Sequence, residues 1–298
     1  MRPGASFRRP FMRVLLPKML FAVGVLTSMS SPAPGGALLF PEGQGQVILT
    51  TTFADASKAY DASGRLISTP SYRKFEAKAY VEYGATDWLT LVGEASGMDF
   101  RGASSSRPDY LNLLIAQAKA RAPLSLTAPE GPHYHYMGLG LGAIGARVRL
   151  FELGNYVISL EASLRAASPS ARRFLDMKDQ WQADARLQIG RPIEIFGVPG
   201  FLDGQIGYRS RGQAGDEIRA DVTCGLRPFD RWLLLAQSFS AITPGAPAPL
   251  FVASQKFQLS AVFDVTRNLS LQLGGVAALS GANSPAERGL VSAVWYRF

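Results

Sequence analysis

The sequence predicts an all-β fold: a transmembrane antiparallel up-and-down β-barrel of about 12 strands. Three observations predict it. From residue 45 onward, segments of about 10 to 14 residues alternate between apolar and polar positions, which is the period of a membrane strand. After residue 30 no apolar run reaches the ~18 positions that a membrane helix needs, although hydrophobic residues make up 47% of the chain. The connections are alternately short and long, a pattern that soluble sandwiches have no reason to show.

The N-terminus has the three parts of a secretion signal. Basic residues are spread over positions 2–18, an apolar core spans Met19 to Leu26, and a Pro-rich stretch of small residues runs to Ala37. We assign residues 1–37 to a signal peptide, with Ala33 and Ala37 as alternative cleavage points. Residues 38–298 then form a single barrel.

Charge and cysteine content exclude several classes of protein. The formal net charge is +8, but residues 1–37 hold five basic and no acidic residues, so the mature chain carries only +3. No Lys/Arg-rich run remains to bind nucleic acid. Cys224 is the one cysteine, so no intramolecular disulfide can form. A glycine run at 140–145 matches the spacing of a dinucleotide site but continues into a strand, so no nucleotide cofactor is predicted. No metal site is predicted either.

The alternation is sharpest from Gln180 to Ile189, where one face carries Gln, Asp and Arg and the other carries Trp, Ala, Leu and Ile. The same pattern defines the other strands. They are expected at residues 46–56, 71–84, 88–101, 138–150, 155–167, 179–191, 200–211, 216–228, 231–242, 254–266, 269–281 and 287–298.

The lengths of the connections orient the barrel. Short connections are expected at 85–87, 151–154, 192–199, 227–231 and 266–268. Longer ones fall at 57–70, 102–137, 168–178 and 243–253, while 212–215 and 282–286 are short exceptions. Because outer-membrane barrels have short periplasmic turns, both termini are expected in the periplasm. Aromatic residues flank four of the short turns and predict an interfacial girdle: Tyr83, Trp88, Phe151, Tyr156, Phe196, Phe201, Phe229 and Trp232.

The long outer loop at 102–137 contains a segment too apolar to lie free in water. Residues 109–121 fit a helix, a thirteenth strand or a plug comparably, and Tyr110, Leu114 and Lys119 are the constriction candidates. The only histidines, His133 and His135, share this loop with the serines at 104–106. A lipid-hydrolysing rim would need such a pair, but a solvated loop explains these residues better, so no catalytic residue is assigned.

The strand faces opposite the apolar ones are expected to line the lumen. Their basic and acidic residues are nearly balanced, so strong ion selectivity is not predicted. The pore-lining candidates are Lys74, Glu76, Lys78, Glu82, Glu94, Arg147, Arg149, Glu161, Arg165, Asp184, Arg186, Asp203, Arg209, Arg211, Glu217, Arg219, Asp221, Lys256 and Asp264.

The C-terminal strand ends on an aromatic residue. Leu290, Val294, Tyr296 and Phe298 share one face, which is similar to the signal that barrel-assembly machinery reads in outer-membrane proteins. The expected partners are therefore this machinery, acting on the strand that ends at Phe298, together with outer-membrane lipid and a small-molecule solute.

Two stretches resemble the family named for the MetA pathway of phenol degradation, a group of channel-like outer-membrane barrels. They are Ala79 to Leu91, with its Tyr-Gly, Thr-Asp and Trp hairpin, and Gly142 to Leu150 together with the strand that follows at 156–160. The resemblance implies a porin-like or transporter-like role, including for aromatic or other small hydrophobic compounds. The long 102–137 loop departs from the family pattern, and no site residue carries over.

The leading expectation is a channel or transporter-like barrel in the bacterial outer membrane for passive uptake of small solutes, and no enzymatic activity. A non-conducting structural or sensing barrel is the alternative, because the charges of the lumen could simply fill it by pairing. A lipid hydrolase at the rim is the weakest of the three.

Overall fold

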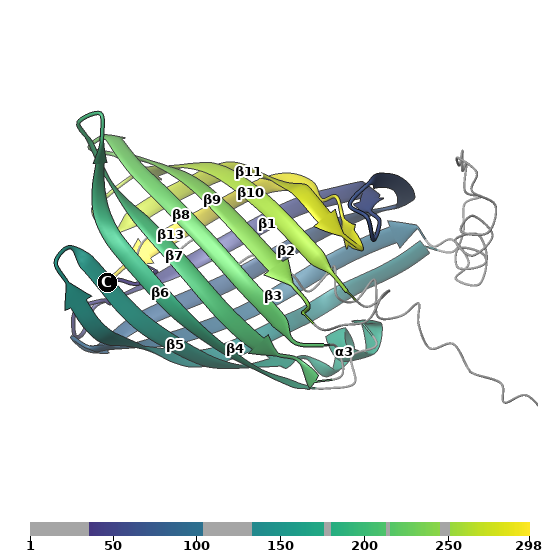
Figure 1. The fold of residues 1–298 in the computed structure, drawn as a ribbon, viewed down its shortest axis with the longest axis horizontal. Helices are drawn as coiled ribbons and strands as arrows, with labels where there is room; N and C mark the ends of the chain where they lie inside the picture. Colours follow the sequence, from purple (N-terminus) through teal and green to yellow (C-terminus); the bar gives the residue numbers. More distant parts are fainter. Residues whose placement is uncertain (1–35, 104–132, 176–179, 213–214, 245–250) are drawn as a thin grey trace, which may run out of the picture.

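The computed structural model describes residues 36–103, 133–175, 180–212, 215–244 and 251–298, which form one closed barrel (Figure 1). The strands are β1 (Gly45–Tyr60), β2 (Leu66–Thr86), β3 (Leu89–Ala103), β4 (His133–Leu153), β5 (Tyr156–Ala167), β6 (Trp181–Ile195), β7 (Val198–Ser210), β8 (Glu217–Phe229), β9 (Trp232–Ile242), β10 (Ala253–Asp264), β11 (Leu269–Ala282), β12 (Ser284–Pro285) and β13 (Arg288–Arg297).

Twelve long strands pair antiparallel with their neighbours, and the first and last strands close the barrel. β1 pairs with β2 on one side and with β13 on the other, from Gln46 opposite Arg297 to Asp55 opposite Arg288. The two-residue β12 only extends this seam at Ala59 and Tyr60. The predicted fold of about twelve strands is confirmed, and closure leaves no unpaired sheet edge in the membrane.

The two ends of the barrel differ as predicted. Two-residue connections at 87–88, 154–155, 196–197 and 230–231 lie at one end, as does the C-terminus (left in Figure 1). We call this the turn end, and the opposite end, which carries the longer connections, the loop end. Residues 36–44, which precede β1, also lie at the turn end, where Gly45 exchanges backbone hydrogen bonds with Phe298.

The connection expected at 192–199 is shorter than predicted. β6 and β7 stay paired up to Ile195 and Val198, so only Phe196 and Gly197 form the turn. Both of these residues have positive φ (51° and 76°), as a tight hairpin turn requires. Pro192 lies inside β6 opposite Phe201. It is tolerated because the pairing of β6 with β5 stops at Gly190, so beyond that point β6 needs fewer backbone donors.

The outward face of the barrel is apolar. Exposed large side chains occur on every long strand, for example Leu139 (71%), Ile144 (74%) and Leu273 (66%). In water such a surface would be costly, whereas in a hydrocarbon layer it is matched to its surroundings. Cys224, on β8, is a free cysteine and partly buried.

Seven of the eight aromatic residues expected in the girdle are exposed near the turn end. They are Tyr83, Trp88, Phe151, Tyr156, Phe196, Phe229 and Trp232. Phe201 is the exception. It packs against a buried cluster inside the barrel, because it shares the parity of the buried Asp203 two residues later.

Apolar side chains fill two parts of the interior. A cluster near the turn end comprises Ile48, Tyr80, Leu233, Leu235, Val262, Ala293 and Trp295. Trp295 is fully buried there and donates its indole N–H to Gln272 Oε1 at 3.1 Å. A second cluster near the loop end comprises Ala56, Tyr72, Phe100, Tyr136 and Ala171.

The described part of the chain contains one short helix, α3 (Pro169–Leu175), in the connection between β5 and β6 at the loop end (Figure 1). Ser168 caps it by accepting a hydrogen bond from the Ala171 N–H at its Oγ (3.1 Å). No helix in the described ranges is long and apolar enough to cross a membrane.

Candidate functional site

Four aromatic side chains stack inside the loop end of the barrel; we call them the aromatic group. Tyr72 and Phe100 have ring centroids 5.1 Å apart, Phe174 of α3 lies 5.6 Å from Phe100, and Tyr136 stacks on Phe174 at 4.8 Å. α3 therefore brings one ring against residues of two strands, β3 and β4. Centroid distances of this size are favourable for aromatic pairs, so the outer part of the interior holds a packed aromatic cluster whose strand residues are buried.

Below this group, a buried carboxylate holds three strands together. Glu287, just before β13, accepts a hydrogen bond from the Tyr72 hydroxyl at 2.6 Å. It also pairs with Lys74 Nζ at 3.1 Å and with Lys256 Nζ at 2.6 Å. We call these four residues the outer knot. One carboxylate neutralises two buried ammonium groups only in part, and the half-buried Glu76 adds the second negative charge near both lysines.

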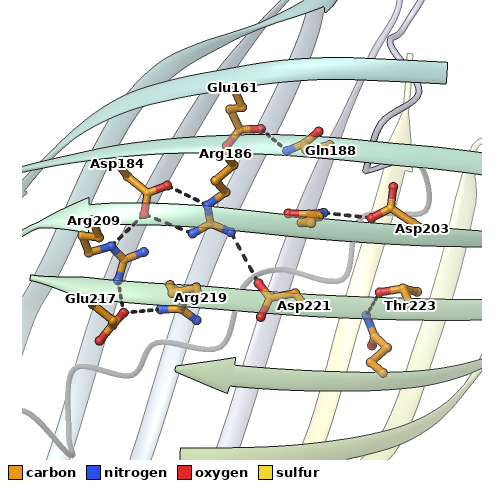
Figure 2. Close-up of polar contacts among 12 residues, drawn as sticks. Glu161, Asp184, Arg186, Gln188, Asp203, Arg209, Glu217, Arg219, Asp221 and Thr223 are labelled. Carbon is orange, nitrogen blue, oxygen red and sulfur yellow. Dashed lines mark hydrogen bonds and ion pairs between the residues drawn. The ribbon is translucent and has the colours of Figure 1, made fainter. Parts of the chain in front are cut away.

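The interior face of β6, β7 and β8 carries an ordered set of arginines and carboxylates, which begins near the loop-end termini of these strands (Figure 2). Asp184, Arg209 and Glu217 lie directly opposite one another in the strand register. Asp184 accepts hydrogen bonds from Arg186 Nε at 2.7 Å and Arg209 Nε at 2.8 Å. Opposite charges at such cross-strand positions favour one register over its alternatives.

Glu217 is shared by three guanidinium groups. Its distances to Arg209, Arg211 and Arg219 are 3.6, 2.9 and 3.3 Å. Arg186 reaches Asp221 at 3.5 Å. These side chains are all buried, and each pair is therefore less screened than a surface pair would be.

A further ion pair joins β3 and β5, the two strands that flank β4. Arg165 Nη2 of β5 lies 2.7 Å from Glu94 Oε1 of β3, and Ala143 of β4 is paired with both residues in the strand register, where its small side chain leaves room for the contact. Lys78 of β2 also interacts electrostatically with Glu94. We call the following residues the middle arginine cluster: Lys78, Glu94, Arg165, Asp184, Arg186, Arg209, Arg211, Glu217, Arg219 and Asp221.

Near the turn end, a single arginine is surrounded by carboxylates. Arg147 Nη2 lies 2.7 Å from Glu82 and 2.8 Å from Glu161. The Tyr80 hydroxyl donates to Glu82 at 2.9 Å, and Gln188 Nε2 donates to Glu161 at 3.1 Å. We call these five residues the inner knot, and in it negative charge exceeds positive.

Residues 36–38 lie inside the barrel beside the inner knot. Ala37 is fully buried, donates its N–H to Asp203 Oδ2 at 2.7 Å and accepts from Ser159 Oγ at 3.0 Å. Arg147 Nη1 reaches the Leu38 carbonyl at 3.4 Å. The chain therefore crosses the interior at the turn end, held by β4, β5 and β7, and it narrows the lumen there.

Most of the pore-lining candidates come together in these groups. Glu76 is half-buried on the same face of β2 as Lys74 and Lys78. Arg149 lies apart, half-buried and 2.8 Å from Glu152. Asp264 lies at the turn end, 2.7 Å from Arg227 and 3.7 Å from Arg297.

Several interior residues were missed by sequence reasoning. Glu287 could have been found, since it has the same parity on the last strand as the buried Val291 and Trp295. The interior position of Ala37 had no signal, because a short segment without periodicity reveals no face. Phe174 lies on a helix that the alternation did not predict.

Other candidates fall elsewhere. The placement of His133 and His135 in a loop at 102–137 is wrong, because β4 begins at His133 and both histidines pair with residues of β3. His135 is exposed and lies 3.0 Å from Asp99, which also pairs with Arg101 at 2.8 Å. Tyr110, Leu114, Lys119, the serines at 104–106 and the whole 109–121 segment lie outside the described residues, as do residues 1–35. The described part of the chain contains no group of three or more His, Cys, Asp or Glu residues that could hold a metal ion.

No protein-family model and no curated protein matches the chain. Among solved structures, the COG4313 outer membrane channel from Pseudomonas putida F1 superposes with a TM-score of 0.61 at 16% identity, covering 90% of this chain and 100% of that one. The NanC porin gives a TM-score of 0.48 at 5% identity over 83% and 98% of the two chains. The P. putida toluene transporter TodX gives 0.43 at 14% identity over 87% and 91%. The first of these likenesses shows a shared barrel fold.

Proposed function

We propose that this chain is a passive channel of the bacterial outer membrane for small solutes that carry an apolar part, including aromatic compounds. The observation that carries the proposal is the aromatic group at the loop end. Stacked rings that face into a barrel, at the end where solutes would enter, can bind an apolar or aromatic solute by burial and ring stacking.

The outer membrane as location, with lipid around the barrel, is supported by two features. The outward face is apolar and ends in exposed aromatic residues at the turn end, which matches a hydrocarbon layer and its interface. The last strand ends at Phe298, which supports recognition by barrel-assembly machinery.

Conductance and uptake test the proposal. The refolded mature protein in a planar bilayer should give steady single-channel conductance. Because phenol also crosses lipid unaided, uptake is measured as the increase over protein-free liposomes, and the barrel should increase phenol uptake more than uptake of a sugar of similar size. Replacing the Phe174 ring should lower this increase for phenol. An equal increase for phenol and sugar would contradict the apolar specificity.

A closed structural barrel is the second candidate, favoured by the residues that cross the turn end. Ala37 and Trp295 are both fully buried there, and every residue of the inner knot has a partner. Absence of conductance and of uptake, with folding verified by circular dichroism, would favour this candidate.

A further inference from the structure

The Glu94 carboxylate occupies a point toward which cations converge from four strands. Arg165 of β5 contacts it at 2.7 Å. Lys78 of β2, Arg209 of β7 and Arg186 of β6 also interact with it electrostatically. Arg165 therefore contacts a carboxylate that is also close enough to cations on three other strands to be stabilised by their charge.

Charge is not balanced along the barrel axis. In the middle arginine cluster six cationic residues (Lys78, Arg165, Arg186, Arg209, Arg211 and Arg219) face four carboxylates (Glu94, Asp184, Glu217 and Asp221). In the inner knot Arg147 faces Glu82 and Glu161, and Asp203 lies nearby. The lumen charges nearly balance when they are summed over the whole barrel, as predicted, but the middle arginine cluster has an excess of positive charge and the inner knot an excess of negative charge.

Two guanidinium groups of the cluster retain donors without an acceptor among the described residues. They are Arg165 at Nε and Arg211 at Nη2, on side chains only 5% and 4% exposed. A buried charged N–H group that lacks an acceptor costs free energy, so these two guanidinium groups are able to bind a further anion. A carboxylate suits them best, since its two oxygens match the fork of a guanidinium.

We propose that the middle arginine cluster is a subsite for the carboxylate group of a small solute, which takes over the ion pair that Arg165 makes with Glu94. The inference deepens the proposed function and rests on solute entry from the loop end. A solute with an apolar body and a carboxylate would meet the aromatic group first and the arginines next. Rings of Arg and Lys select anions in other pores by the same electrostatics.

Binding to the refolded full barrel in detergent tests the subsite without requiring transport. Benzoate and its neutral analogue benzyl alcohol are the probes, measured by titration calorimetry. The wild type should bind benzoate at least about tenfold more tightly than benzyl alcohol, because one charge-assisted hydrogen bond contributes about 1.5 kcal/mol or more.

Two variants should move this preference in opposite directions. Arg165→Gln should abolish it, whereas Glu94→Gln removes the competing carboxylate and should strengthen benzoate binding. Arg191→Gln is the matched control, since this half-buried arginine contacts Tyr156 on the outer face of the barrel, away from the interior. A folded Glu94→Gln barrel that binds benzoate no better than the wild type would overturn the subsite.

Planar-bilayer recordings separate this inference from the proposed function. In a KCl gradient the reversal potential should favour chloride, and Arg165→Gln should shift it toward zero. Conductance without anion preference and without benzoate binding overturns the subsite but leaves the channel. Benzoate binding in a barrel that neither conducts nor takes up phenol supports the subsite and contradicts the channel.

Discussion

The Ala37 N–H donates to a carboxylate oxygen of Asp203 at 2.7 Å, deep inside the barrel. A Cβ atom at Gly36 would collide with the same carboxylate, so only a glycine fits at this position beside Asp203. Residues 36–38 therefore fit the interior as part of the folded chain. This favours signal cleavage upstream of Gly36 over cleavage after Ala37.

The intact mass of the mature protein checks this directly. We expect a mature chain that retains Gly36 and Ala37, because their removal would leave Asp203 and Ser159 without these backbone partners. A mature chain that begins at Leu38 would contradict the prediction.

Asp203→Ala should loosen the segment in the mature barrel. The lost charge-assisted hydrogen bond is worth about 1.5 to 3 kcal/mol. Hydrogen exchange at residues 37–44 should therefore accelerate, and any conductance should rise. Asp264→Ala, which removes a carboxylate at the turn end but no contact with this segment, should change neither.

Glu287→Gln should destabilise the barrel far more than loss of a surface carboxylate. Lys74 and Lys256 would lose their shared partner while remaining buried, which costs about 3 kcal/mol or more. The measurement is urea unfolding of the refolded protein. Asp55→Asn is the control, since it removes an exposed partner of Arg288 on the neighbouring strand, worth about 1 kcal/mol or less. Equal effects of the two substitutions would show that the outer knot contributes little.

The sequence predicted which side chains face the interior better than it predicted which of these side chains contact one another. Period two places Asp184 and Arg186 on the same interior face, because side chains alternate across a strand. It cannot say that Arg165 meets Glu94 two strands away, since that contact depends on strand register and barrel curvature. The alternation also fails at a register shift. Between Tyr136 and Leu141 the pairing of β4 with β3 slips, so both residues are buried despite their opposite parity.

Phe174→Ala should lower uptake of an aromatic solute without closing the barrel. The ring contacts Phe100 and Tyr136 from a short helix at the loop end, so its loss removes part of the aromatic group but no strand pairing. Phenol uptake by liposomes should fall severalfold while ion conductance stays unchanged. Phe229→Ala, an exposed turn-end residue, serves as the control. A fall in both quantities would indicate misfolding instead.

Asp61, in the turn between β1 and β2, should have an unusually low pKa. Asp61 accepts hydrogen bonds from the Ser63 hydroxyl at 2.7 Å and from the Ser63 and Arg65 backbone N–H groups at 2.8 and 3.0 Å. These bonds, the Ser63 hydroxyl foremost, lower the pKa of Asp61 to about 2. Since the folded pKa is depressed, the stabilisation of the turn is present above the unfolded pKa of about 4 and is lost as pH falls toward 2.

Carbon NMR of the Asp61 carboxyl measures this pKa. Ser63→Ala should raise it toward 3.8, while Thr266→Ala, in a turn at the opposite end, should leave it unchanged. An Asp61 pKa that does not respond to Ser63→Ala would disprove the assigned cause.

Removal of the terminal aromatic residue should impair assembly more than folding. Phe298 and Gly45 exchange backbone hydrogen bonds at 3.0 and 2.9 Å where the last strand meets the first, and the Phe298 ring stacks with Tyr296 at 6.3 Å. Phe298→Ser keeps both backbone bonds but removes the ring, so refolding in detergent should be nearly normal. In cells, the heat-modifiable barrel recovered from outer membranes should fall severalfold, because the assembly machinery would lose its aromatic end. Phe196→Ser alters a fully exposed turn aromatic at the same end and should assemble normally. Equal recovery of the two variants would mean that the terminal ring is not read during assembly.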